Sequence, residues 1–243
     1  MTWRSPSELV TLGFSRAPIV MMNEGHNGLQ RCARTRRIGK AILPAAHAAG
    51  CRTLAMEALA HPGDGPTTFT AANPPERVVY LEQPEMWDFV EAALALGWTL
   101  VAYEPSGDLA PAALLGDGAD RYRGLPFTNW REEQQATNIL RAFAGHTPML
   151  VWCGNGHHFK TASDWVPMGS VVAAKTPVFC IDQIVTVALA EGHTPPIVLT
   201  PELSATLESL GGTAGFLVDE TPAGLRRITN VDAVLLSTDN AVY

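Results

Sequence analysis

Short apolar runs alternate with longer segments in which apolar and polar positions repeat at a helical period. The runs have the length and the apolar content of buried strands, and the segments between them place apolar side chains three and four residues apart. This pattern predicts strands at residues 17–22, 53–57, 98–104, 148–153 and 177–185, and helices at 28–48, 85–96 and 129–144. Three late runs, at 197–200, 215–219 and 232–237, are read as further short strands.

The order of strand, helix and strand predicts the fold class. Such alternation is typical of an α/β protein with three layers, in which a mainly parallel central sheet carries helices on both faces. We expect one such domain over residues 1–243. In open sheets of this kind, function gathers beyond the carboxyl ends of the strands.

Several residues suggest where elements begin and end. Gly97 is placed to end the second helix, and Pro44 is expected to kink or end the first. Asn129, followed three residues later by Glu132, resembles a capping box and predicts that the third helix begins there. Residues 60–78 and 105–128 are rich in Gly and Pro, so we expect loops that cover the cleft and set specificity.

Composition narrows the classes of partner. The chain is 47% hydrophobic and 17% charged, which is enough apolar content for a large core. Its net charge of −7 argues against a nucleic acid or an anionic membrane as the main partner, apart from a local basic run at 31–40. With no apolar run of about 20 residues, no secretory signal and four widely spaced cysteines, we expect a cytoplasmic protein with reduced thiols.

Polar or titratable residues follow at least four of the predicted strands, and the carboxyl ends of parallel strands share one edge of a sheet. The residues concerned are Glu24, His26, Glu57, Glu104, Asn155, His157 and His158. Arg131 begins a helix that leads into one of these strands, so it should reach the same edge. A cation gains nothing from the dipole of a first helical turn, which suggests that Arg131 pairs with Glu57 or binds a substrate anion.

The residue types at this edge suit acid–base chemistry. Glu24 and His26 share a face if the chain there is extended, and a carboxylate can orient an imidazole that takes a proton from water. By the same rule His157 and His158 point to opposite sides, so one of them should face the site. Cys153 is read as a buried apolar residue rather than a nucleophile.

The ordered motifs resemble the erythromycin esterase-like and ChaN-like superfamily, which includes the TraB and TIKI proteins. Its strand ending in G-E-x-H corresponds to residues 23–28, with Asn23 in place of the first glycine, and its later strand ending in glutamate corresponds to Met56-Glu57. A helix that opens R-[DE]-x-x-M-A-x-N corresponds to residues 131–138, with Gln135 in place of methionine. The G-N-x-H, M-G and D-A-V motifs correspond to residues 154–157, 168–169 and 232–234.

The resemblance implies the same α/β fold, and activities that range over ester hydrolysis, peptide cleavage and haem binding. Our leading hypothesis is a hydrolase acting on an ester or amide in a small molecule or peptide, in antibiotic or natural-product metabolism. His26 would be the general base, Glu24 and Glu57 would orient it, and His157 would polarise the carbonyl or protonate the leaving group. Arg131 would hold Glu57 or a substrate carboxylate. The residues predicted to line the substrate cleft are Asn155, His158, Glu104 and Glu132.

Other chemistries stay open at this point. Glu24, His26, Glu57 and His157 would suit a zinc or manganese ion if a metal is present. A protein that binds haem or another cofactor is the second class, although haem is not expected without a lipoprotein signal. A biosynthetic enzyme that uses the same acid–base set for elimination or cyclisation is the third.

Overall fold

The structure, a computed structural model, describes residues 2–25, 29–59, 65–145, 147–187 and 194–238. Its centre is an eight-stranded sheet with the order β3-β4-β2-β5-β1-β6-β8-β7. The strands are β1 (Ile19–Glu24), β2 (Thr53–Met56), β3 (Thr67–Phe69), β4 (Thr99–Ala102), β5 (Met149–Gly154), β6 (Val178–Asp182), β7 (Thr213–Leu217) and β8 (Ala233–Ser237). The two edge strands, β3 and β7, pair antiparallel with their neighbours, and the other pairings are parallel.

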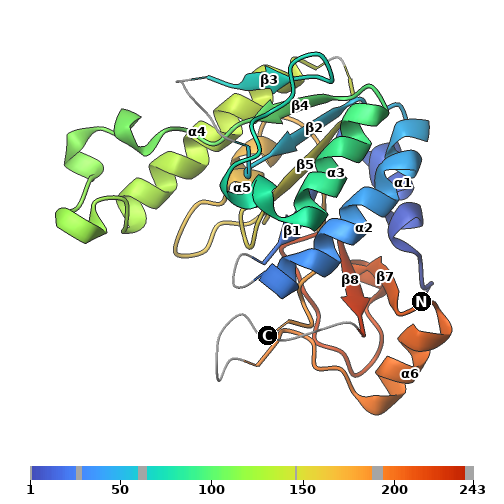
Figure 1. The fold of residues 1–243 in the computed structure, drawn as a ribbon. Helices are drawn as coiled ribbons and strands as arrows, with labels where there is room; N and C mark the ends of the chain where they lie inside the picture. The colour runs from blue at the N-terminus through green and yellow to red at the C-terminus, as the bar shows by residue number, and fades with distance from the viewer. Residues whose placement is uncertain (1, 26–28, 60–64, 146, 188–193, 239–243) are drawn as a thin grey trace.

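Helices cover both faces of this sheet, which confirms the predicted fold class (Figure 1). On one face lie α1 (Pro6–Arg16), α2 (Leu29–Ala48) and α3 (Pro84–Ala95), whose apolar side chains form one core with the sheet. On the other face α4 (Leu125–Phe143), α5 (Met168–Ala173) and α6 (Pro201–Ser209) form a second core. The described residues also contain five short 3-10 helices: Val79–Glu82, Gly107–Leu109, Ala112–Leu114, Gly118–Asp120 and Val218–Glu220.

Alternation along each strand decides which core a side chain joins. In β1, Val20 and Met22 belong to the core under α1, α2 and α3, whereas Ile19 and Met21 belong to the core under α4, α5 and α6. All six residues of β1 are buried, as expected for an inner strand of a parallel sheet with both faces covered. Continuing the alternation sends Glu24 to the α2 side and Asn23 to the other.

Several predicted boundaries were wrong. α4 begins at Leu125, after Gly124 with φ 95° and with Pro126 in its first turn, so neither Asn129 nor Glu132 caps it and Arg131 lies in its second turn. Asn129 instead accepts a hydrogen bond from the backbone N–H of Val166. By contrast, α2 covers the helix predicted over 28–48, and Pro44 lies inside it and does not end it.

Two other segments have a secondary structure different from the one predicted. Residues 67–69, predicted to be loop, form the edge strand β3. Residues 197–200 are not a strand: Thr200 caps α6, and the backbone N–H of Ile197 donates to the carbonyl of Val185. Among the described residues, no helix is both long enough and apolar enough to span a membrane.

Candidate active site

Five of the predicted residues meet at the carboxyl ends of β2, β4 and β5. Helix α4 passes over this edge on the side of the second core, and its second and third turns carry the side chains that contact the strand ends. Figure 1 shows the first turns of α4 and the segment 105–124 extending beyond the sheet. The assembled residues are Glu57, Glu104, Arg131, Glu132 and His157.

Arg131 joins Glu57 and Glu104, which follow β2 and β4. Its Nη2 donates to Glu57 Oε1 at 2.6 Å and to Glu104 Oε2 at 2.8 Å, and its Nε donates to Glu104 Oε1 at 2.5 Å. Gln135, one helical turn later, donates to the same Glu104 carboxylate. The predicted pairing of Arg131 with Glu57 is therefore present, and two carboxylates already balance the guanidinium charge, which disfavours a role in holding a substrate carboxylate.

The two glutamates differ in their surroundings. Glu57 also accepts a hydrogen bond of 2.6 Å from the backbone N–H of Gly154, which fixes its carboxylate between β2 and β5. Burial raises the pKa of Glu104, and the neighbouring Arg131 opposes that shift while Glu57 adds to it. The site thus concentrates negative charge around a single arginine.

His157 lies between two carboxylates. Its Nδ1 is 2.5 Å from Glu132 Oε1, and its Nε2 is 3.7 Å from Glu57 Oε1. The other oxygen of Glu132 accepts a bond of 2.7 Å from the backbone N–H of Met168, at the start of α5. Burial lowers the pKa of His157, but the hydrogen bond to Glu132 and the charge of Glu57 outweigh it, so the pKa is raised. Glu132 therefore orients His157 and does not line the cleft as predicted: its side chain is fully buried.

Glu24 does not join this group. Its carboxylate accepts two hydrogen bonds of 2.9 Å from Arg36 of α2 and one of 2.9 Å from the indole N–H of Trp152. Both partners lie on the α2 face, whereas Glu57 follows Met56 of that face and so points to the opposite one. Glu24 is thus a buried ion-pair residue that points away from the face of Glu57, and its predicted role in orienting His26 stays a prediction.

The remaining predicted residues divide three ways. His158 is completely buried, neither ring nitrogen has a hydrogen-bond partner among the described residues, and burial lowers its pKa to about 3. It therefore cannot line the substrate cleft, and only His157 of the pair reaches the site. Asn155 is partly buried in the turn after β5, and its role in binding substrate stays a prediction. His26 lies outside the described residues.

The described residues do not fit a divalent metal. Within the parts of the chain that the structure describes, no group of three His, Cys, Asp or Glu residues could hold such an ion. Glu57 and Glu132 direct their oxygens at N–H donors, Arg131 places a positive charge between the carboxylates, and Glu24 lies on the far face. The predicted zinc or manganese set is thus not assembled from Glu24, Glu57 and His157.

Some residues of this edge were not predicted. Gln135 contacts Glu104 from the same helix face as Arg131, because the two residues are four apart on α4. Asp182, at the end of β6, accepts from the side chain of Asn23 at 2.9 Å and from the backbone N–H of Ile184 at 3.0 Å. The rule for strand ends that led to Glu57 also points to Asp182.

Comparison with known proteins gives only structural similarities. No protein-family model matches the sequence, and no curated protein matches it significantly. The type III effector HopBA1 shares 18% identity at a TM-score of 0.45, over 75% of this chain and 84% of that one. A structure of cofacial heme binding to ChaN of Campylobacter jejuni shares 9% identity at a TM-score of 0.49, over 93% of this chain and 90% of that one.

A third structure, described as bacterial protein toxins, shares 13% identity at a TM-score of 0.44. That alignment covers 73% of this chain and 37% of the toxin chain. Likeness at this level says nothing about what the chain binds or does, which depends on the site itself.

Proposed function

We propose that the protein is a hydrolase that cleaves an ester or amide bond in a small molecule or peptide, with His157 as its proton donor. The observation that carries the proposal is the Glu132–His157 pair, a fully buried carboxylate 2.5 Å from Nδ1 of an imidazole. The proposal includes the finer assignment to the erythromycin esterase-like and ChaN-like superfamily, which rests on the ordered motifs, and a role in antibiotic or natural-product metabolism in the cytoplasm.

The chemistry follows from the partners of the imidazole. With Nδ1–H donating to Glu132, only Nε2 is available to exchange a proton with a substrate. Water attacks the carbonyl carbon, a general base takes its proton, and the bond to the leaving group breaks as His157 delivers a proton to that group. For the base the sequence predicts His26. Glu57, 3.7 Å from Nε2, favours the charged imidazole before the transfer.

The test compares variants on a panel of esters and amides, with products analysed by mass spectrometry in water labelled with oxygen-18. His157→Ala should lower the rate about 10²–10⁴-fold, as expected for loss of an acid–base group. Glu132→Gln should lower it less, and Glu133→Gln, an exposed neighbour on α4, serves as the matched control. Circular dichroism confirms that each variant is folded.

The outcomes separate the alternatives. Oxygen-18 in the product with loss of rate in His157→Ala supports hydrolysis at this site. A product formed by loss of water would indicate the elimination or cyclisation enzyme instead, and a Soret band in the purified protein would favour haem binding. A folded His157→Ala variant that keeps its rate would overturn the assignment of the proton donor.

A further inference from the structure

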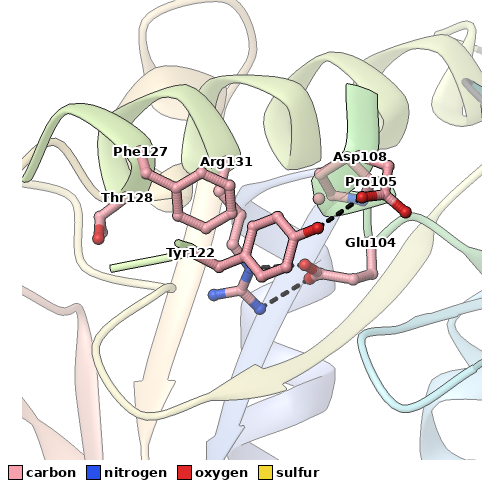
Figure 2. A pocket seen from close by; sticks show the side chains of 8 residues that line it. Glu104, Pro105, Asp108, Tyr122, Phe127, Thr128 and Arg131 are labelled. Atoms are coloured by element: carbon pink, nitrogen blue, oxygen red, sulfur yellow. Dashed lines mark hydrogen bonds and ion pairs between the residues drawn. The ribbon is translucent and has the colours of Figure 1, made fainter. Parts of the chain in front are cut away.

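A cavity of about 450 Å³ lies directly beside the acid–base cluster, and Arg131 forms part of its wall. The other walls come from the first turns of α4 and from the irregular segment after β4. Figure 2 shows Glu104 and Asp108 on one side of this pocket and the rings of Tyr122 and Phe127 on the other. The pocket is therefore the place from which a bound molecule would approach the cluster.

Negative charge dominates this region. At the inner wall Glu104 contacts Arg131, and Glu57 lies on the other side of the same guanidinium, so two carboxylates flank one arginine. Asp108 adds a carboxylate at the outer wall. The exposed Arg121 lies 3.9 Å from it and over the Tyr122 ring, 5.5 Å from the ring centroid, where solvent screens the pair and a bound cation would take its place. An anionic ligand would meet repulsion from both walls, whereas a cationic ligand would be attracted.

Aromatic rings complete the arrangement. The ring centroids of Tyr122 and Phe127 are 5.5 Å apart, and the phenol O–H of Tyr122 donates to Asp108 at 2.5 Å. Aromatic faces next to carboxylates are the groups that recognise ammonium ions, because the ring quadrupole and the negative charge act together. The apolar rings also accept the alkyl substituents of such an ion.

We infer that this pocket binds a cationic nitrogen group of the substrate, an alkylammonium or quaternary ammonium group, and so selects cationic esters or amides. The inference rests on the proposed function, since it takes the pocket to hold the substrate of His157. The nitrogen would lie between Glu104, Asp108 and the ring of Tyr122. The scissile bond would then extend past Arg131 toward the imidazole.

The test uses three probes of nearly the same shape: choline, neutral 3,3-dimethylbutan-1-ol and anionic 3,3-dimethylbutyrate. Binding is measured by calorimetry on the wild-type protein and on His157→Ala, so that it does not depend on turnover. We expect choline to bind about 5- to 30-fold more tightly than the alcohol, as cation–π and charge effects of this kind predict, and the butyrate to bind most weakly. Added salt should reduce the preference.

A variant that removes one negative charge tests whether the preference for choline arises at Asp108. Asp108→Asn keeps the shape and a hydrogen-bond acceptor for Tyr122, and should lower the preference for choline about threefold or more. Asp117→Asn removes the same charge from an exposed residue of the same segment that does not line the pocket, and should leave the preference unchanged. Equal binding of choline and the alcohol, or equal effects of the two variants, would overturn the inference.

Turnover then distinguishes this inference from the proposed function. Acetylcholine and 3,3-dimethylbutyl acetate form the corresponding ester pair. If choline binds with the stated preference but no ester or amide of the panel is cleaved, the pocket assignment stands and the hydrolase proposal fails. If neutral esters are cleaved in a His157-dependent way while choline shows no preference, the hydrolase proposal stands and the pocket assignment fails.

Discussion

Replacing Glu132 with glutamine changes the charge next to His157 while keeping the side chain's shape. In the protein, the two oxygens of Glu132 accept from His157 Nδ1 at 2.5 Å and from the backbone N–H of Met168 at 2.7 Å. The single carbonyl of a glutamine can serve only one of these donors. Loss of one hydrogen bond to a charged group costs about 1.5–3 kcal/mol.

The size of that cost should depend on pH. The pKa of His157 is raised above its usual 6.5, so the charged pair contributes its full stability below about pH 6.5 and loses it as pH rises through the folded-state pKa. We therefore expect Glu132→Gln to lower the free energy of unfolding by about 2–3 kcal/mol at pH 6 and by about 1 kcal/mol or less at pH 9. The hydrogen bond from Met168 N–H and the smaller desolvation cost of an uncharged glutamine contribute equally at both pH values. Only the pairing with the His157 charge therefore changes between them.

Urea denaturation of both proteins at several pH values measures this difference, because groups that titrate equally in both chains cancel. Glu133→Gln on the exposed face of α4 controls for the loss of a helix charge. Proton NMR of the His157 ring should also show a lower pKa in the Glu132→Gln variant. A destabilisation that stays constant from pH 6 to pH 9, or grows, would refute the view that Glu132 holds a charged imidazole.

Three further predictions concern the neighbouring buried groups. Arg131→Met leaves Glu57 and Glu104 without their shared cation and should lower the free energy of unfolding, measured in urea, by about 3–5 kcal/mol. Replacing both glutamates with glutamine in that variant should restore part of the loss, and no recovery would contradict this explanation. His158→Phe should make folding less sensitive to acid: the folded-state pKa of about 3 lies below the unfolded value of 6.5, so wild-type stability falls by up to about 1.4 kcal/mol per pH unit between these values. Thermal denaturation at pH 7 and pH 4 checks this, and equal acid sensitivity would contradict it. Glu24→Gln should cost about 3 kcal/mol in urea yet leave the pH dependence of turnover unchanged, and a shifted pH–rate curve would show that it takes part in the chemistry.

The sequence located the strands well because each inner strand is an unbroken apolar run, and a parallel sheet then brings their ends to one edge. That reasoning correctly grouped Glu57, Glu104 and His157, and it gave the Arg131–Glu57 contact. The same runs hide the face to which a residue points, since a strand buried on both sides shows no alternation of apolar and polar positions. This is why Glu24 was grouped with Glu57 although it points to the opposite face.

Helix starts were harder to predict because more than one local signal was present. Asn129 and Glu132 have the spacing of a capping box, but Gly124 and Pro126 begin the helix earlier, and the two side chains are used in tertiary contacts instead. The helix α1 carried a true capping box at Ser5 and Glu8 that the periodicity alone did not reveal. Contacts between elements, which no local pattern encodes, decided the roles of Glu132 and His158.

The short connection between His157 and α5 has a consequence for protein engineering. Its far end is tied back to the histidine turn, since Gly169 N–H donates to the carbonyl of His157 at 2.7 Å and a Cβ at Gly169 would lie 2.5 Å from the backbone of His158. Among the intervening residues, 161–164 are exposed. Trp165 packs edge-on against the His157 ring, with centroids 5.6 Å apart, and Val166 N–H donates to Asn129, so these two residues belong to the anchored part. Because the anchors lie outside 161–164, that stretch can be exchanged for loops of other length and composition while the imidazole stays in register with Glu132.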